Sequence, residues 1–229
     1  MPGARILAII PAFNESARIG PVVAAAKAHL PVLVVDDGST DDTAAVAVAA
    51  GATLLQLRPN QGKGAALQAG FRRALADGWD AVVTLDADGQ HDPAEVPQFL
   101  ALYRSREVDL ILGTRRCRRM PPVRRVANYL GRIAFSWALG RPVRDNQSGY
   151  RLMSRRLLEA AQAGREQGFE FEVEVIVLCV ERGLQMEQLP IRTIYGGQTS
   201  HIRGAHHLKQ FLRMVLETRR RTRRLLRPG

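Results

Sequence analysis

The segment AVVTLDADGQHDP, residues 81–93, does most to decide the fold. Its first five residues are apolar except for one threonine, which predicts a short strand buried on both faces. Asp86 and Asp88 follow at the end of this strand, and Asp92 stands before a proline, an order typical of a helix N-cap. The segment therefore predicts a buried strand, a polar loop and the start of a helix.

The same unit recurs along the first half of the chain. Further short apolar runs, each expected to be a strand buried on both faces, occupy residues 6–10, 32–35, 53–57 and 110–112. Alanine-rich segments of helical length lie between the runs, at about 17–29, 41–50, 63–77 and 93–105. Strands that alternate with helices predict an α/β fold, with a mostly parallel central sheet flanked by helices and joined by right-handed crossovers.

The loops that follow four of these strands are polar and rich in small residues. They read PAFNE at 11–15, DDGSTDD at 36–42, RPNQGKG at 58–64 and DADGQHDP at 86–93. Parallel strands end at the same edge of a sheet, and ligands of open α/β sheets bind beyond the carboxyl ends of the strands. We therefore expect the four loops to form one site.

Asp86 and Asp88 are the first candidates for metal binding. Alternate residues of an extended segment face the same way, so both carboxylates are able to meet one cation, and Gln90 adds an amide oxygen. Hard divalent ions take oxygen ligands and keep positions for phosphate groups. An isolated Asp-x-Asp is more often an ordinary acidic turn, but its place after a buried strand and beside three polar loops favours the metal site.

Two other loops carry candidates for nucleotide binding. Asp36 and Asp37 precede a glycine, and capping of the next helix explains the serine and threonine that follow but not two consecutive acids. The segment 60–64 (NQGKG) combines glycines, which allow close approach of the backbone, with Lys63. This pattern suits phosphate, and its alternative is a glycine turn with a surface lysine. The sequence has neither a Walker A motif nor a GxGxxG fingerprint.

The second half of the chain changes character. The segment 115–125 is dense in arginine and is either a solvated loop or a site for a phosphorylated acceptor. An amphipathic helix with apolar residues from 126 to 137 follows. The remaining expected elements are a polar loop at 144–151 (RDNQSGYR), a helix at 172–182 and a late strand at 188–194.

Composition sets outer limits on function. Of the 229 residues, 46% are hydrophobic and 6% aromatic, and the net charge of +11 favours polyanionic partners such as nucleic acid, anionic lipid or phosphorylated substrates. A non-catalytic basic protein that binds nucleic acid is the alternative of another class, but it needs aromatic platforms, and the acidic loops oppose it. The two cysteines have no zinc or disulfide spacing, and we expect neither a signal peptide nor a membrane-spanning segment.

Six motifs, in order, resemble family 2 glycosyltransferases of the GT-A fold, in the dolichol-phosphate-mannose-synthase-like, or polyprenyl-phosphate glycosyltransferase, branch. They are IPAFNE (10–15), VVDDGSTDDT (34–43), NQGKGAALQAGF (60–71), LDADGQHDP (85–93), RDNQSGYR (144–151) and IYGGQTSH (194–201), within roughly residues 5–215. The resemblance implies a metal-dependent inverting enzyme that moves a sugar from a nucleoside-diphosphate sugar, of the GDP-mannose or UDP-glucose type, to a polyprenyl or dolichyl phosphate.

The resemblance also assigns roles to residues by position. For the nucleotide it implies Pro11, Ala12, Glu15, Asp37, Gly62 and Lys63, with Glu15 near the ribose and Asp37 at the base. For Mg²⁺ or Mn²⁺ on the diphosphate it implies Asp86, Asp88 and Gln90. On the acceptor side it implies Asp145, Gln147, Ser148 and Glu174, with Arg124, Arg125 and Arg132 for the acceptor phosphate. Of these, the expected catalytic residues are Asp88, Asp145, Glu174 and the three arginines.

The acceptor decides what chemistry the protein must supply. A lipid phosphate is already ionised at neutral pH and needs only position and charge neutralisation. A hydroxyl acceptor, the alternative within the same family, needs a general base, for which Asp145 and Glu174 are the candidates. A nucleotidyltransferase shares the α/β layout, but such enzymes place a glycine-rich basic loop after the first strand, where this chain has PAFNE.

The end of the chain predicts a basic amphipathic helix. Leu208, Phe211, Leu212 and Val215 form an apolar stripe, and residues 219–224 hold five arginines. We therefore expect a GT-A catalytic domain at 1–207 and a basic amphipathic segment at 208–229. Such a helix either lies on anionic lipid or packs on the domain, and both can hold together. The resemblance implies a peripheral protein on the cytoplasmic face of a membrane, and a membrane-embedded partner protein is also considered, because many relatives carry membrane helices.

Overall fold

The computed structural model describes residues 3–115, 122–162, 171–192, 194 and 204–223, and at 122–128, 204–210 and 212 the description is confined to the backbone. The elements are β1 (Ile6–Ala12), α1 (Ser16–Lys27), β2 (Val32–Asp36), α2 (Thr43–Ala49), β3 (Thr53–Gln56), α3 (Lys63–Ala76), β4 (Ala81–Thr84), the 3₁₀ turn η1 (Pro93–Glu95), α4 (Val96–Ser105), β5 (Leu110–Arg115), α5 (Pro122–Leu139), β6 (Arg151–Ser154), α6 (Arg155–Gln162), α7 (Phe171–Glu181), β7 (Met186–Ile191) and α8 (Gly204–Thr222).

Within the described ranges the strands form one sheet, in the order β3-β2-β1-β4-β6-β5-β7. β1 is parallel to β2 and β4, β2 is parallel to β3, and β5 is parallel to β7. Among these strands only β6 runs the other way, between β4 and β5. The α/β class and the mostly parallel sheet predicted from the alternating sequence pattern are confirmed.

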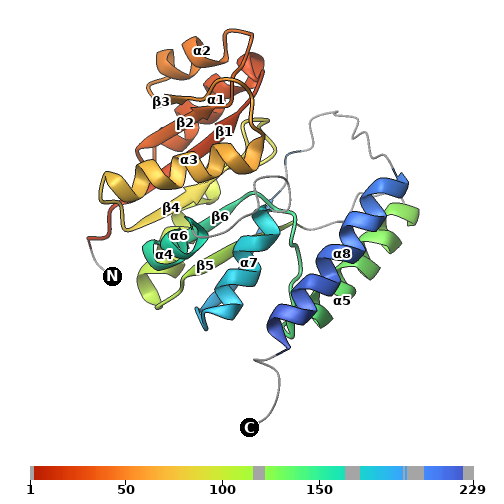
Figure 1. Ribbon diagram of the computed structural model, residues 1–229. Helices are drawn as coiled ribbons and strands as arrows, with labels where there is room; N and C mark the ends of the chain where they lie inside the picture. Colours follow the sequence, from red (N-terminus) through yellow and green to blue (C-terminus); the bar gives the residue numbers. More distant parts are fainter. Residues whose placement is uncertain (1–2, 116–121, 163–170, 193, 195–203, 224–229) are drawn as a thin grey trace.

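Helices cover both faces of the sheet (Figure 1). On β1, Leu7 and Ile9 belong to a core cluster shared with α3, α6 and α7. Ile6, Ala8 and Ile10 point to the other face and belong to a cluster shared with α1 and α4. Because successive side chains of a strand alternate between faces, a strand covered on both sides must be apolar at every position.

The expectation that segment 53–57 is a strand buried on both faces is wrong. β3 lies at the edge of the sheet with a single neighbour, β2, and its four residues are all at least partly exposed. The structure also contains β6 and α6, which the sequence pattern does not predict. The sequence of β6, RLMS, is short and begins with arginine, so neither its length nor its apolar pattern predicts a buried strand.

The direction of β6 matters for the site. An antiparallel strand begins where its neighbour ends, and Arg151, the first residue of β6, is paired with Thr84, the last residue of β4. The loop that precedes β6 therefore lies at the same edge of the sheet as the loops that follow β1, β2 and β4. β5 runs parallel to β4, so its last residue, Arg115, reaches this edge as well.

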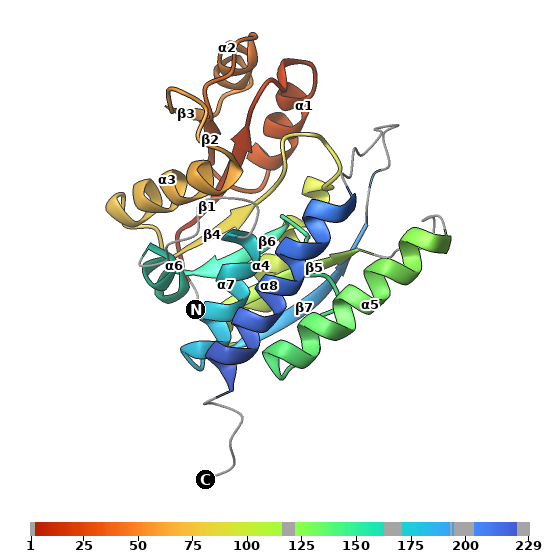
Figure 2. The ribbon, with the colours of Figure 1, turned by 45° about the vertical axis from the view of Figure 1, so that its right-hand side comes forward.

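α5 and α8 lie side by side, away from the end of the sheet formed by β1, β2 and β3 (Figures 1 and 2). α8 contacts both α5 and α7 and buries Val215, Thr218 and Thr222. It begins at Gly204, before the expected boundary, so the division into 1–207 and 208–229 stays a prediction. In the described part of the chain, no helix has both the length and the apolar character needed to span a membrane.

Candidate active site at the carboxyl ends of the strands

The centre of the candidate site is the carboxylate of Asp86, just after β4. Lys63, the first residue of α3, places its Nζ 2.6 Å from Asp86 Oδ1 and 3.1 Å from Glu172 Oε1. Burial disfavours the charged ammonium, but the two carboxylates outweigh burial and hold the pKa of Lys63 above its ordinary value. The lysine is therefore charged at neutral pH and joins two acidic groups from different elements.

His91 holds the backbone of Asp86 in place. Its Nδ1 accepts a hydrogen bond from the Asp86 N–H at 3.0 Å, and the side chain is almost fully buried. Burial lowers the pKa of His91, which keeps the ring neutral at pH 7 and leaves Nδ1 able to accept. The imidazole also packs on the ring of Tyr150, with 5.1 Å between centroids. His91 is thus a support for the acidic loop.

Gly149 provides the space that the Asp86 carboxylate occupies. A Cβ atom at this position would lie 2.6 Å from Asp86 Oδ1 and 2.9 Å from Oδ2, closer than a side chain tolerates. The carbonyl oxygen of Gly149 accepts a hydrogen bond from Thr84 Oγ1 at 2.6 Å, which ties the loop to the end of β4. The glycine of the segment 144–151 is therefore required by close packing against the acidic loop.

The buried side chain of Arg151 binds the loop that precedes β6. Its guanidinium, 2% exposed, donates from Nε to the carbonyl oxygen of Ser148 at 2.8 Å and from Nη2 to that of Asn146 at 3.1 Å. Nη1 donates to the carbonyl oxygen of Glu172. A planar guanidinium reaches three carbonyls at once, so this side chain fixes both the loop before β6 and the start of α7.

Asp37 fixes the loop between β3 and α3. Its Oδ1 accepts the N–H of Gln61 at 2.9 Å, and its Oδ2 accepts the N–H of Gly62 at 2.7 Å. Gly62 has a φ of +91°, a left-handed conformation that favours glycine. The carboxylate thereby sets the entry into α3 and the position of Lys63. Contact of Asp37 with a nucleobase stays a prediction.

The loops after β1 and β2 are joined by hydrogen bonds. Asn14 Oδ1 accepts the N–H of Thr40 at 2.8 Å, and the N–H of Asn14 donates to Ser39 Oγ at 3.0 Å. Asn14 itself has a φ of +54°, which asparagine tolerates better than most residues. These bonds join the loops after β1 and β2 on one side of the site.

The residues expected to bind the nucleoside lie at the end of β1 and in the loop that follows it. Pro11 and Ala12 are buried at the end of β1, opposite Val35 and Asp36 of β2. Glu15 precedes α1, and its carboxylate lies 2.6 Å from a guanidinium nitrogen of Arg18. The structure thus brings these residues to the same edge as Asp37, and their contacts with a nucleoside stay a prediction.

Asp88 and Gln90 lie in the same acidic loop as Asp86. The N–H of Gln90 donates to Asp88 Oδ1 at 2.9 Å, and all three residues are partly exposed. In the described part of the chain no group of three His, Cys, Asp or Glu side chains is arranged to hold a metal. The expected donors are the carboxylates of Asp86 and Asp88 and the amide oxygen of Gln90, and the ammonium of Lys63 is in contact with the first of them. Such an oxygen-only and incomplete set fits Mg²⁺ or Mn²⁺ that completes its shell with phosphate oxygens and water. Binding of a metal by these residues stays a prediction.

Asp145, Gln147 and Ser148 lie in the loop before β6. Arg115, at the end of β5, binds the Asp145 carboxylate through Nε at 2.7 Å and Nη2 at 3.1 Å. Burial acts to raise the pKa of Asp145, but Arg115 outweighs it and holds the pKa below its ordinary value. Ser148 is fully buried, and Gln147 is exposed and donates its N–H to Asp145 Oδ1 at 3.1 Å.

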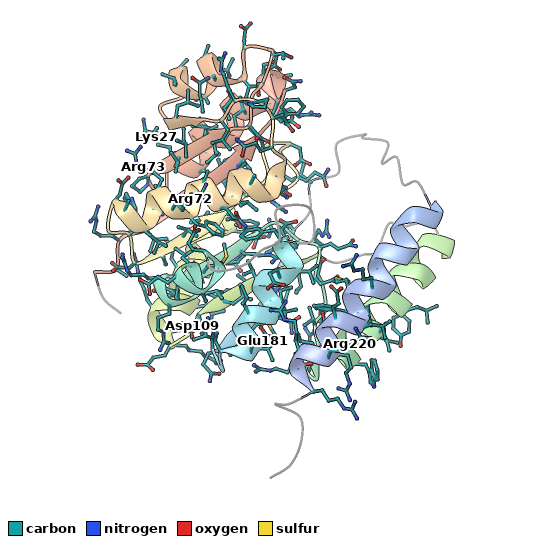
Figure 3. All side chains as sticks on the ribbon, in the orientation of Figure 1. Lys27, Arg72, Arg73, Asp109, Glu181 and Arg220 are labelled. Carbon is teal, nitrogen blue, oxygen red and sulfur yellow. The ribbon has the colours of Figure 1, made fainter. Side chains whose placement is uncertain are left out.

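Glu174 is not brought to this group. Successive helical residues are rotated by about 100°, so Glu172 and Glu174 lie on nearly opposite faces of α7. Glu172 faces Lys63, whereas the Glu174 carboxylate accepts two hydrogen bonds from Arg221 of α8, at 2.6 and 2.9 Å. Arg221 also binds Glu181, which Figure 3 shows at the end of α7 toward α8. Glu174 thus joins α7 to α8 instead of facing Asp86.

Of the expected acceptor arginines, only Arg132 has a described side chain, and no described contact joins it to Asp86. Arg132 is exposed on α5, with its guanidinium 5.1 Å from the centroid of the Tyr129 ring. Arg124 and Arg125 belong to the first turns of α5, and their side chains lie outside the described residues. Most of the motif 194–201 also lies outside the described residues. The role of these arginines stays a prediction.

Several residues of the site are not predicted from the sequence. Glu172, His91, Arg115, Gly149 and Arg151 all touch the acidic loop or its supports. Four of the five lie inside or beside the motifs of the sequence. Glu172 has no signal there, because its role depends on contact with Lys63, more than a hundred residues away in the chain.

Comparisons with known proteins agree with this geometry. The family model of Glycosyl transferase family 2 matches residues 7–161. The undecaprenyl-phosphate mannosyltransferase of Micrococcus luteus is 31% identical over 202 residues, which cover 82% of this chain and 82% of that protein. The polyprenol monophosphomannose synthase of Mycolicibacterium smegmatis is 30% identical over 206 residues, covering 83% of this chain and 77% of that protein.

A solved structure shares the fold. Glucosyl-3-phosphoglycerate synthase from Mycobacterium tuberculosis, in complex with Mn²⁺, uridine diphosphate and phosphoglyceric acid, matches with a TM-score of 0.70 and 25% identity over 99% of this chain and 80% of that chain. Fold and site define a GT-A glycosyltransferase. The chain belongs to glycosyltransferase family 2, in the dolichol-phosphate-mannose-synthase-like branch, which confirms the resemblance of its motifs.

Proposed function

We propose that the protein is an inverting glycosyltransferase that moves a sugar from a nucleoside-diphosphate sugar, of the GDP-mannose or UDP-glucose type, to a polyprenyl or dolichyl phosphate, with Mg²⁺ or Mn²⁺. The observation that carries the proposal is the contact of Lys63 with Asp86 at the carboxyl ends of the parallel strands. It places a glycine-lysine loop suited to phosphate beside an acidic pair suited to a divalent ion. The names of the Micrococcus and Mycolicibacterium relatives support the lipid phosphate.

The residues of the chain mainly position the reactants. Asp86, Asp88 and Gln90 would hold the metal, which when bound would neutralise charge on the departing nucleoside diphosphate. Asp37 fixes the backbone N–H groups of the loop before α3. Gly149 and the neutral His91 fix Asp86 itself. A rigid site of this kind lowers the barrier by orientation.

The ion pairs of the two candidate bases, Asp145 and Glu174, favour an acceptor that is already ionised. Asp145 is bound by Arg115 through two hydrogen bonds, and Glu174 is bound by Arg221 in the same way. A carboxylate held by a guanidinium is a weaker base, because proton transfer to it must break the ion pair. A lipid phosphate needs no base at neutral pH, so both ion pairs are compatible with it.

A hydroxyl acceptor is the second candidate. The Mycobacterium tuberculosis structure with a TM-score of 0.70 is a complex with phosphoglyceric acid, which is not a lipid phosphate. An acceptor of this type would need a base other than the two carboxylates held by arginine.

We also propose that the protein binds the membrane at its periphery, on the cytoplasmic side, through the basic C-terminal helix α8 and the face of α5 that lies beside it. Tyr129, Ile133 and Trp137 recur every four residues on one face of α5 and are 53%, 47% and 57% exposed. Arg132 lies over the Tyr129 ring and Arg219 over the Trp137 ring, at 5.1 and 4.6 Å from the centroids. Aromatic rings flanked by arginines suit the boundary between anionic head groups and acyl chains. A membrane-embedded partner protein would bind at the same face.

The decisive experiment is transfer from a panel of GDP- and UDP-sugars to polyprenyl phosphate, with Mg²⁺, with Mn²⁺ and with chelator, by the native protein and by Asp88→Ala. Metal-dependent transfer to the lipid phosphate, lost in the variant, is the expected result and identifies the donor. Transfer only to hydroxyl acceptors would replace the lipid-phosphate proposal with the second candidate. Absence of turnover with every donor would overturn the proposal.

A further inference from the structure

Lys63 occupies one of the carboxylate oxygens of Asp86 that a divalent ion would use. Its Nζ is 2.6 Å from Asp86 Oδ1, the contact distance of a charged hydrogen bond. An ammonium and a divalent cation repel each other strongly at such distances in a partly buried site. Charge repulsion therefore opposes binding of a metal to Asp86, as in the proposed function on which this inference rests, for as long as Lys63 stays on the carboxylate.

The structure contains a second carboxylate, that of Glu172, with which the lysine can pair. Glu172 Oε1 is 3.1 Å from the same Nζ, and the Glu172 side chain is only 7% exposed. A buried carboxylate that loses its cation is strongly destabilised. A short movement of Nζ from Asp86 toward Glu172 would keep Glu172 neutralised and would release Asp86. The lysine then never becomes an unpaired buried charge.

Glu172 is itself held in place independently of Lys63. Arg151 donates from Nη1 to the backbone carbonyl oxygen of Glu172 at the start of α7. The same guanidinium binds the carbonyl oxygens of Ser148 and Asn146, in the loop that packs against Asp86 through Gly149. One buried arginine thus joins the backbone of Glu172 to the loop that packs against Asp86, so the proposed change needs only a movement of the lysine side chain.

We propose that Glu172 is a positioning residue that sets the metal affinity of the site by drawing Lys63 away from Asp86. Lys63 is in this view a resident counter-ion that the metal displaces, and Glu172 decides how easily it is displaced. Glu172 touches neither donor nor acceptor in this role. It acts through Lys63.

The test is Mn²⁺ affinity in the absence of nucleotide, by calorimetry and by the electron paramagnetic resonance of free Mn²⁺. Glu172→Gln leaves Lys63 with Asp86 as its anionic partner and is expected to weaken Mn²⁺ binding about tenfold, the effect of one charge interaction of ordinary strength. Lys63→Met removes the competitor and is expected to strengthen binding. In the Lys63→Met background, Glu172→Gln is expected to change the affinity less than about threefold.

Controls separate this role from a general field effect. Glu181→Gln removes a carboxylate from the same helix, one that pairs with Arg221, and is expected to leave the Mn²⁺ affinity unchanged. Circular dichroism and thermal unfolding show whether each variant is folded, and Glu172→Gln keeps both the shape of the side chain and the backbone carbonyl that Arg151 binds.

The outcomes distinguish this inference from the proposed function. An equal loss of affinity from Glu172→Gln with and without Lys63 would mean that Glu172 acts only by its charge, and would overturn the inference. Weaker Mn²⁺ binding by Lys63→Met would overturn it as well. No Mn²⁺ binding by any of the proteins, Lys63→Met included, would overturn the proposed metal site together with the inference.

Discussion

Gly149 and the carboxylate of Asp86 are packed so closely that a Cβ atom on Gly149 would lie 2.6 Å from Asp86 Oδ1. Two segments more than sixty residues apart in sequence are matched at this point, one ending β4 and the other leading into β6. The match explains why a glycine is needed in the second segment even though no left-handed backbone conformation requires it there.

We predict that Gly149→Ala displaces Asp86 and lowers kcat/KM about 10- to 100-fold, the loss expected from a misplacement of the order of 1 Å. Overpacking would also lower the free energy of unfolding by about 1–3 kcal/mol. Steady-state kinetics and urea unfolding measure the two effects. The matched control is Gly131→Ala in α5, where the new Cβ would lie 3.4 Å from the Phe211 ring, an ordinary contact. Equal kinetics of Gly149→Ala and Gly131→Ala would contradict the prediction.

Asp145 should give the protein a pH-dependent stability. Its folded-state pKa is depressed because Arg115 outweighs burial, so its contribution is present above the unfolded pKa of about 3.9 and is lost as pH falls through the folded pKa. We predict that Asp145→Asn lowers the free energy of unfolding by roughly 2 kcal/mol at pH 7, less than for a fully buried pair because Arg115 is 30% exposed.

The difference in unfolding free energy between the native protein and Asp145→Asn should stay constant between pH 5 and 8 and shrink below about pH 4. Urea unfolding at a series of pH values measures it. A difference that does not change on acidification would show that the loss comes from packing and not from the ion pair. The control is Asp77→Asn, in an exposed pair with Arg73 that should contribute at most about 1 kcal/mol.

Arg151 is a structural requirement that lysine cannot meet. Its guanidinium serves three backbone carbonyls, and a lysine ammonium in the same space would leave at least one of them without a donor. We predict that Arg151→Lys lowers the free energy of unfolding by roughly 3 kcal/mol, the cost of one or two buried acceptors left unsatisfied. Arg155→Lys, four residues later and more exposed, is the control. A loss below about 1 kcal/mol for Arg151→Lys would contradict this account.

The ion pairs of α7 lead to a separate prediction for Glu174. Arg221 binds both Glu174 and Glu181, and hydrogen bonding to Glu181, with that to Glu174, raises its pKa above the ordinary value in spite of burial. We predict that Glu174→Gln loosens α8 from α7 and lowers the free energy of unfolding by about 1 kcal/mol, since Arg221 keeps its second partner. Thermal unfolding measures this. A loss of kcat at unchanged stability would instead support Glu174 as a catalytic base.

The fold could be predicted from the sequence because most of its strands are nearly continuous apolar runs between helical segments, a pattern typical of a sheet covered on both faces. The exceptions have physical reasons. β3 is apolar in sequence yet lies at the edge of the sheet, and sequence does not show how many neighbours a strand has. β6 is not predicted from the sequence, because a strand of four residues that begins with arginine is too short to show a pattern of apolar residues.

The sequence predicts only those site residues whose type and position are informative without their contacts. The acidic loop, Lys63 and Asp37 follow predicted strands, and each can be identified from the sequence without knowledge of its contacts. Glu172 and Arg151 are visible only as partners, because their roles depend on contacts with residues far away in the chain. In the choice between Glu172 and Glu174, the sequence offers two similar residues, and only the rotation of α7 shows which of them faces Lys63.

The face of α5 formed by Tyr129, Ile133 and Trp137 should govern binding to membranes. We predict that Trp137→Ser weakens binding to vesicles that contain anionic lipid about tenfold or more, because burial of a large apolar side chain contributes roughly 1.5–3 kcal/mol. Co-sedimentation with vesicles at several salt concentrations measures this, and binding should fall as ionic strength rises, since the arginines beside the rings are screened. Val48→Ser is the matched control, because Val48 is 52% exposed but lies on α2, away from α5. If Trp137→Ser and Val48→Ser bound vesicles equally well, the protein would have to reach its lipid acceptor by a surface other than α5.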